Sequence, residues 1–161
     1  MEINGVAHVI LTVSNFEACY PFYEKLLTYL GMKPVIQGEQ MLYCVGGRTA
    51  VGIMRCDDAH RAEKFQQRRV GLHHVCLRAR ERKDVDEIYG FLKTMGAKIV
   101  HPPEDGPWAP GYYSVLFEDP DGIRVEVNYV PGQGHLGPGG RLGPGGGGPA
   151  RGYGAGGIST T

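Results

Sequence analysis

An internal duplication constrains the fold more than any other feature of the sequence. Residues 7–11 read A-H-V-I-L and residues 73–77 read H-H-V-C-L, so that His8 aligns with His74. Each copy then runs through an apolar periodic segment to a G-x-K-x-V sequence, at residues 31–35 and 96–100. Self-similarity of this kind is the signature of a repeated supersecondary unit. We therefore predict an α+β fold of two tandem βαβββ modules.

The first module is assigned to residues 1–58. Alternating apolar residues predict its strands over residues 6–13, 32–36, 40–45 and 49–55. A helix is predicted between the S-N-F-E sequence at residues 14–17, which resembles a capping box, and Gly31. Pro21 falls inside this helix and removes a backbone hydrogen bond. We expect an irregular first turn, or a regular helix that begins near Pro21.

The second module is assigned to residues 70–131, after a charged linker at residues 59–69 in which a short helix is conceivable. Its strands are predicted over residues 72–79, 97–101, 112–118 and 123–130, and its helix ends at Gly96. Residues 102–111 hold four prolines and the only tryptophan, Trp108, and we expect an ordered loop that covers a pocket. The D-P-D-G sequence at residues 119–122 predicts a tight turn.

The composition narrows the classes of partner. Lys and Arg together number 17, as do Asp and Glu, so that no overall basic charge favours nucleic acid or an acidic membrane surface. No apolar run is long enough to span a membrane, and no signal segment opens the chain. We expect a cytoplasmic protein with a small-molecule partner. The four cysteines lack C-x-x-C spacing and are expected to be reduced thiols.

The last segment, residues 132–161, differs in composition from the rest of the chain. It holds more than half of the 26 glycines and few apolar residues. Such a segment cannot bury enough apolar surface to offset the conformational entropy lost on ordering. We expect a flexible tail that follows a folded domain of residues 1–131.

Three side chains form the strongest candidate site. His8 and His74 occupy matched strand positions, and Glu126 stands between Val125 and Val127 and should face away from the core. If the first strands of the modules meet side by side, the two histidines converge and Glu126 approaches from the neighbouring strand. Two imidazoles and a carboxylate form a facial metal triad with open coordination positions. A single strand histidine is more often structural, but repetition at matched positions favours ligation.

Residues 3–130 resemble the vicinal oxygen chelate superfamily, which includes glyoxalases, extradiol dioxygenases and fosfomycin- and bleomycin-resistance proteins. The resemblance lies in A-H-V-I-L-T-V, F-Y-E-K-L-L-T-Y-L-G, H-H-V-C-L and, above all, F-E-D-P-D-G-I-R-V-E-V. It implies a cupped, half-open barrel in which His8, His74 and Glu126 bind a divalent ion that a substrate chelates through adjacent oxygens. Fe²⁺ or Mn²⁺ is favoured, with Zn²⁺ or Ni²⁺ as alternatives. A homodimer is expected, with modules paired within or between chains.

One departure from the family pattern reduces the number of reaction classes that the resemblance allows. A glyoxalase I has a fourth ligand, an acid on the last strand of module one, and here that strand reads A-V-G-I-M at residues 50–54. The resemblance therefore implies a dioxygenase-like or a lyase- or transferase-like enzyme and not a lactoylglutathione lyase. The alternative is a metal-free binding or sequestration protein of the bleomycin-resistance type.

Several further residues are candidates for the same site. Cys76 follows His74 by two residues and should share its strand face, whereas His73 should alternate to the helix-packing side and be structural. Tyr113 is our candidate catalytic acid or base. The candidate substrate-binding residues are Arg78, Arg124, Trp108 and Tyr112.

Overall fold

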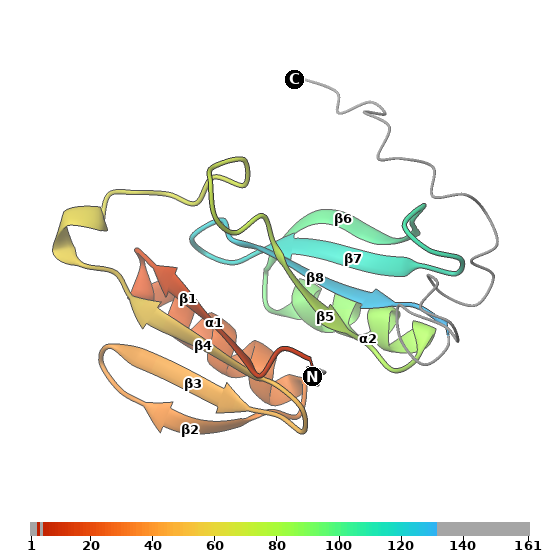
Figure 1. Cartoon of the computed structure of the whole chain (residues 1–161), viewed down its shortest axis with the longest axis horizontal. Coiled ribbons are helices and arrows are strands. Elements are labelled where there is room, and N and C mark those ends of the chain that lie inside the picture. Colours follow the sequence, from red (N-terminus) through yellow and green to blue (C-terminus); the bar gives the residue numbers. More distant parts are fainter. Residues whose placement is uncertain (1–2, 4, 132–161) are drawn as a thin grey trace.

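Two βαβββ modules follow each other along the chain, as the duplication predicts (Figure 1). The computed structural model describes residue 3 and residues 5–131, so that the predicted tail lies outside the described residues. Module one comprises β1 (His8–Val13), α1 (Phe16–Tyr29), β2 (Lys33–Gln37), β3 (Met41–Val45) and β4 (Ala50–Arg55). Module two comprises β5 (Val75–Arg78), α2 (Arg82–Thr94), β6 (Lys98–Asp105), β7 (Tyr113–Glu118) and β8 (Arg124–Tyr129).

The two sheets have the same topology. Their strand orders are β1-β4-β3-β2 and β5-β8-β7-β6, and in each the first strand pairs parallel with the last while the remaining pairs are antiparallel. This confirms the predicted α+β class and the tandem modules. Among the described residues no ladder joins one sheet to the other, so that the two sheets do not close into a barrel.

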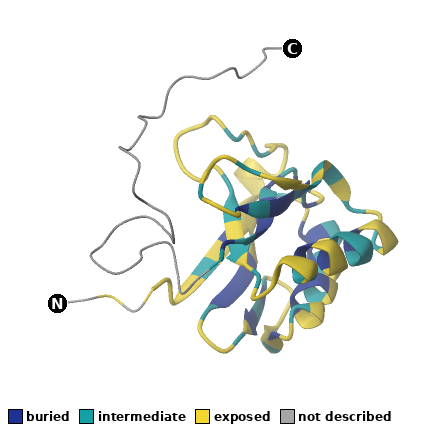
Figure 2. Cartoon of the chain, turned by 90° about the vertical axis from the view of Figure 1, so that its right-hand side faces the viewer, coloured by how far each residue is buried: buried dark blue, intermediate teal, exposed yellow. Residues whose placement is uncertain are grey.

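The core lies where the helices meet the sheets. Figure 2 shows the buried residues in the strands and on the inner faces of the helices, with the exposed residues on the outer helix faces and in the loops. The side chains buried most completely include Tyr23, Leu26 and Leu27 of α1 and Phe117 of β7. No helix in the described part of the chain is long and apolar enough to cross a membrane.

Contacts made by α1 join the modules. Tyr29 of α1 stacks on Phe91 of α2, with ring centroids 3.8 Å apart and planes at 5°. The Tyr23 hydroxyl donates to Asp119 Oδ2 at 2.9 Å, from a buried position. Because these contacts lie on the helix side, the modules are held together without pairing of β1 with β5.

Helix α1 begins at Phe16, before the start near Pro21 that was one of the two predictions. It starts at Phe16 and includes Pro21 without a break, so that the expected irregular first turn is wrong. The Asn15 side chain accepts a hydrogen bond from the Ala18 N–H at 3.2 Å, and a carboxylate from module two, described below, binds the backbone preceding the helix. These added hydrogen bonds at the N-terminus offset the one that Pro21 removes.

Strand β6 extends further than predicted. It continues through Pro102 and Pro103 to Asp105, a stretch assigned to a loop from its proline content. The strand lies at the sheet edge, where a missing N–H is tolerated, and its register with β7 shifts twice between Ile99 and Glu104. In the linker a short 3₁₀ helix forms at Asp58–His60.

Candidate metal centre

The register of β5 and β8 places Glu126 beside Cys76. Cys76 pairs with Glu126 across the ladder, and Arg78 pairs with Asn128. Side chains alternate along a strand, so that Val125 and Val127 enter the core while Glu126 points to the opposite face. The valines packed against α2 thus fix the direction of the carboxylate.

His74 and Glu126 come together as the sequence predicts. His74 Nε2 lies 3.2 Å from Glu126 Oε2, while the Tyr112 hydroxyl donates to Oε1 of the same carboxylate. Glu126 is only 8% exposed. Burial, followed by the hydrogen bond to Glu126, raises the pKa of Tyr112, which therefore stays protonated as a donor at neutral pH. Each carboxylate oxygen thus has its own neighbour.

His73 contacts His74, contrary to the helix-side position that strand alternation predicted. The two Nδ1 atoms lie 2.7 Å apart, with the rings edge to face at 73°. The linker residue Gln67 places its Nε2 3.2 Å from His73 Nδ1. The alternation rule fails here because β5 begins only at Val75. Loss of water, followed by the charges of His74 and Arg124, lowers the pKa of His73. In the sequence, the adjacency of His73 and His74 was the one signal of this contact.

Cys76 lies on the same sheet face as Glu126, and its thiol is protonated at neutral pH. The residue is exposed, but crowding by neighbouring protein atoms and the adjacent Glu126 carboxylate raises the pKa of its thiol to about 12. A thiol in this state is a weak nucleophile at neutral pH. Cys76 is therefore a lining residue of the face that carries Glu126.

Tyr113 lies on the other side of the sheet from Glu126. Its hydroxyl donates to Asp86 Oδ1 of α2 at 2.6 Å, and the Arg82 guanidinium lies 3.5 Å from its ring centroid. Tyr113 was assigned as the catalytic acid or base, but strand alternation turns its side chain toward α2 and away from Glu126. Tyr112 is the tyrosine beside the carboxylate.

For three predicted substrate-binding residues, the structure shows contacts or exposure but no contact with His74 or Glu126. Arg78 Nη2 donates to the Val130 carbonyl at 2.8 Å, and Arg124 Nε lies 3.5 Å from Glu118 Oε1. Trp108 is 65% exposed, in the turn between β6 and β7. Their role in substrate binding stays a prediction.

His8 does not join the other two candidate ligands within one chain. It opens β1, with its ring centroid 6.4 Å from that of Tyr43. Within residue 3 and residues 5–131, no three His, Cys, Asp or Glu side chains form a group that could hold a metal ion. The convergence expected from adjacent first strands is therefore not seen inside a single chain, whose modules pack through their helices.

Gly52 occupies the position in module one that corresponds to Glu126. It pairs with Ile10, two residues after His8, as Glu126 pairs with Cys76, two residues after His74. A Cβ atom on Gly52 would lie 2.8 Å from Tyr43 Cδ2 and 3.0 Å from the Leu42 carbonyl oxygen. Strand β4 thus has neither an acid here nor room for one, in keeping with a site without a fourth carboxylate.

In module one, the sheet face that carries Gly52 is apolar and exposed. The residues on the same sheet face as Gly52 follow from the register of β1, β3 and β4. Among them Ile10, Val45 and Met54 are each about two fifths exposed, and the Tyr43 ring lies against Gly52. This apolar face lies on the sheet that carries His8.

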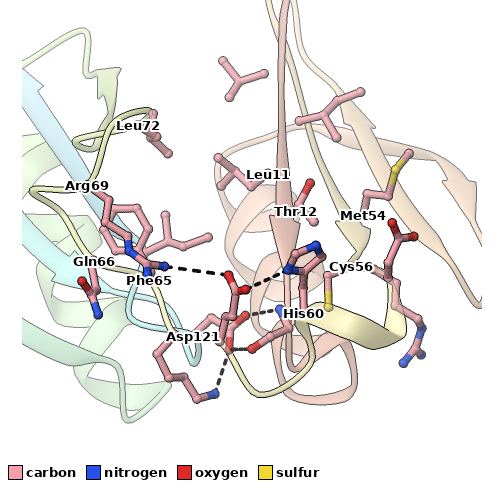
Figure 3. A pocket seen from close by; sticks show the side chains of 18 of the residues that line it. Leu11, Thr12, Met54, Cys56, His60, Phe65, Gln66, Arg69, Leu72 and Asp121 are labelled. Atoms are coloured by element: carbon pink, nitrogen blue, oxygen red, sulfur yellow. Dashed lines mark hydrogen bonds and ion pairs between the residues drawn. The ribbon is translucent and has the colours of Figure 1, made fainter.

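A cavity of about 630 Å³ lies beside β1, and Figure 3 shows the residues that line it. Its walls come from β1, from the linker and from the β7–β8 turn, with Leu11, Phe65 and Leu72 among the apolar side chains. The charged side chains bind one another: His60 and Arg69 both contact Glu63, and Lys64 contacts Asp121. The three candidate metal ligands do not line it.

Comparisons with known proteins agree with the fold. A candidate glyoxalase of known structure from Bacillus halodurans is 29% identical, covers 78% of this chain and 96% of its own, and has a TM-score of 0.69. The structure of lactoylglutathione lyase from Agrobacterium tumefaciens is 21% identical, covers 80% and 96%, and has a TM-score of 0.59. The uncharacterized protein YqjT of Bacillus subtilis is 29% identical over 124 residues, 74% of this chain and 94% of that protein.

A family model also matches most of the chain. The match extends over residues 5–127, from before β1 into β8, and includes His8, His74 and Glu126. The chain belongs to the Glyoxalase/Bleomycin resistance protein/Dioxygenase superfamily.

Proposed function

We propose that this protein is a metal-dependent enzyme of the vicinal oxygen chelate type, acting on a small molecule with two adjacent oxygens. His8, His74 and Glu126 would hold a divalent ion, with Fe²⁺ or Mn²⁺ favoured over Zn²⁺ or Ni²⁺. The reaction class is dioxygenase-like or lyase- or transferase-like. The absence of an acid at Gly52 supports a site that lacks the fourth ligand of a glyoxalase I.

The approach of His74 to Glu126 is the observation that carries this proposal. An imidazole nitrogen and a carboxylate oxygen lie 3.2 Å apart, and the carboxylate is buried. The Tyr112 hydroxyl is a neutral donor to Glu126 Oε1, and Oε2 of the same carboxylate faces His74 Nε2. A buried carboxylate beside an imidazole is a donor set that suits a divalent cation.

We infer that a second copy of the chain supplies His8. One chain by itself brings only His74 and Glu126 together, while His8 stands on the open apolar face of module one. Pairing of module one of one chain with module two of another would cover that face and complete the triad. Burial of the face is a driving force for such a dimer. The expected partners are therefore a second copy and a small substrate.

The residues around the Glu126 carboxylate would orient it and bind the substrate. The ion would supply a Lewis acid to which two substrate oxygens bind. Tyr112 holds Glu126 Oε1 and so leaves Oε2 turned toward His74. Asn128, which follows Glu126 on the same face and is buried, offers an amide to a substrate oxygen. Burial of Glu126 and Asn128 excludes water from this side of the site.

Metal analysis of the dimer tests the proposal. The protein purified without chelator should contain iron or manganese near one ion per chain, and Glu126→Ala should contain none. The matched control is Glu118→Ala, which removes a carboxylate of the neighbouring strand that pairs with Lys98. Equal metal content in the parent and in Glu126→Ala would overturn the proposed ligand set.

Mixing two inactive variants tests the origin of His8. In a dimer of His8→Ala with Glu126→Ala, exchange between chains leaves one of the two sites intact, because intact His8 and intact Glu126 come from different chains. If all three ligands came from one chain, neither site of the mixed dimer would be complete. Recovery of half of the parental metal content in the mixed dimer is expected. No recovery would place all three ligands in one chain.

Metal-free sequestration is the alternative function, and the open apolar face around Tyr43 favours it. Absence of metal in the parent, with no uptake when Fe²⁺, Mn²⁺ or Zn²⁺ is titrated, would support this alternative. An aromatic ligand should then bind equally to the parent and to Glu126→Ala.

A further inference from the structure

The cavity beside β1 has an apolar lining that four separate stretches of the chain supply. Leu11 comes from β1, Phe65 from the linker, Leu72 from the segment before β5 and Ile123 from the segment before β8. Figure 3 shows Phe65 and Leu72 on one side of the space and Leu11 and Met54 on the other. A volume of about 630 Å³ lies within the range of small-molecule sites, about 300–1,000 Å³.

Most of the charged side chains that line this cavity are paired with one another. His60 Nδ1 lies 2.8 Å from Glu63 Oε1, and Arg69 Nη1 lies 3.8 Å from Oε2 of the same carboxylate. Lys64 Nζ lies 3.1 Å from Asp121 Oδ1. A ligand with a net charge would therefore have to break an existing pair to gain a counter-ion here.

The other polar residues of the lining fit the same description. Arg55 Nη1 lies 2.7 Å from Glu17 Oε1, and Asp57 is exposed, so that water solvates its carboxylate. Thr12 and Gln66 contribute a hydroxyl and an amide, which are uncharged donors and acceptors. The cavity thus offers apolar contacts together with a few neutral hydrogen-bonding groups.

We propose that this cavity is a second binding site, for a neutral and largely apolar small molecule of aromatic type. His8, His74 and Glu126 do not line the cavity, so that the site is separate from the proposed metal centre and does not depend on it. Covering the apolar lining provides the driving force for binding. A bound molecule would contact both modules and the linker, and should reduce the opening of the linker.

Fluorescence titration with two related probes tests the chemical class of the ligand. N-phenyl-1-naphthylamine is neutral and should bind the parent with about one probe per chain. 1-Anilinonaphthalene-8-sulfonate has the same aromatic skeleton with an added sulfonate, and should bind about 10-fold more weakly because the cations of the lining are paired. No saturable binding of the neutral probe, or equal affinities for the two probes, would overturn the proposal.

A matched pair of variants tests the location. Leu72 is 37% exposed and lines the cavity, whereas Val45 is 39% exposed and lies on the sheet face that carries Gly52. Leu72→Asn should weaken binding of the neutral probe by about 10-fold, and Val45→Asn should leave it unchanged. Ile10 and Met54 border both surfaces and are left intact. Equal losses, or a loss in Val45→Asn alone, would overturn the proposal.

Hydrogen exchange of the parent gives a second readout that does not depend on the folding of any variant. With the neutral probe bound, the backbone amides of residues 61–72 should exchange more slowly with water. The amides of β2, at the opposite edge of the sheet from β1, should be unaffected. Protection of β2 and β3 without protection of the linker would overturn the proposal.

Discussion

Asp121, in the turn between β7 and β8, caps the segment that leads into α1 by binding Ser14, 107 residues earlier in the chain. The Ser14 hydroxyl donates to Oδ1 at 2.8 Å, and the backbone N–H groups of Ser14 and Asn15 donate to Oδ2. Lys64 of the linker donates to Oδ1 at 3.1 Å. One buried carboxylate thus joins module two, module one and the linker.

Loss of the Asp121 carboxylate should destabilise the protein strongly. Asp121→Ala leaves three donors near Ser14 without their partner, and we expect the free energy of unfolding to fall by about 2–4 kcal/mol. The control is Asp58→Ala, which removes an exposed ion pair with Arg61 and should change stability by less than about 0.5 kcal/mol. Urea unfolding measures both. Similar losses in the two variants would contradict the capping role.

Asp119 should make stability depend on pH. Burial raises the pKa of its carboxyl to about 6, although hydrogen bonds from Ile123, Tyr23 and Asp121 oppose the shift. Because the folded pKa lies above the unfolded value, this group's contribution to stability is full below pH 4 and is lost as pH rises through 6. Two pKa units correspond to on the order of 2–3 kcal/mol.

Asp119→Asn isolates this effect because an amide does not titrate. Its oxygen can still accept from the backbone N–H groups of Asp121 and Ile123, which both donate to Oδ1. The stability of the parent relative to the variant should decrease between pH 4 and pH 7 in guanidinium unfolding. Parallel stability curves for the two proteins over this range would contradict the assignment.

Tyr112 and Tyr113 should differ in their effect on metal affinity. Tyr112→Phe removes the donor to Glu126, and Zn²⁺ affinity should fall by about 10- to 100-fold. Tyr113→Phe removes a bond to Asp86 on the other side of the sheet and should leave Zn²⁺ affinity unchanged. Calorimetric titration compares this matched pair. Equal effects of the two substitutions would exclude a role for Tyr112 in orienting the carboxylate.

Gly52 should tolerate no side chain. Gly52→Ala would bring Cβ to 2.8 Å from the Tyr43 ring and 3.0 Å from the Leu42 carbonyl oxygen, so that the free energy of unfolding should fall by about 1–3 kcal/mol. At Gly47 an added Cβ meets nothing within 4 Å, and Gly47→Ala should be nearly neutral. Thermal unfolding of the two variants tests the difference. An unchanged midpoint in Gly52→Ala would show that Tyr43 moves aside freely.

The order of strands and helices and the tandem arrangement of two modules follow from local patterns in the sequence. Period-two alternation is enough to direct Glu126 away from the core, because Val125 and Val127 enter it. The repeat of His8 at His74 likewise identifies equivalent positions without any structure. Local rules were less accurate where β6 crosses Pro102 and Pro103, since tolerance of proline depends on whether a strand lies at a sheet edge.

Only the tertiary structure decided which side chains meet. The contact of His73 with His74 depends on β5 beginning at Val75, and the orientation of Tyr112 and not Tyr113 toward Glu126 depends on which face of β7 meets α2. The separation of His8 from His74 and Glu126 depends on modules that pack through Tyr29 and Phe91 of their helices. Residues distant in sequence are brought together by packing between elements, and periodicity within one element carries no information about that packing.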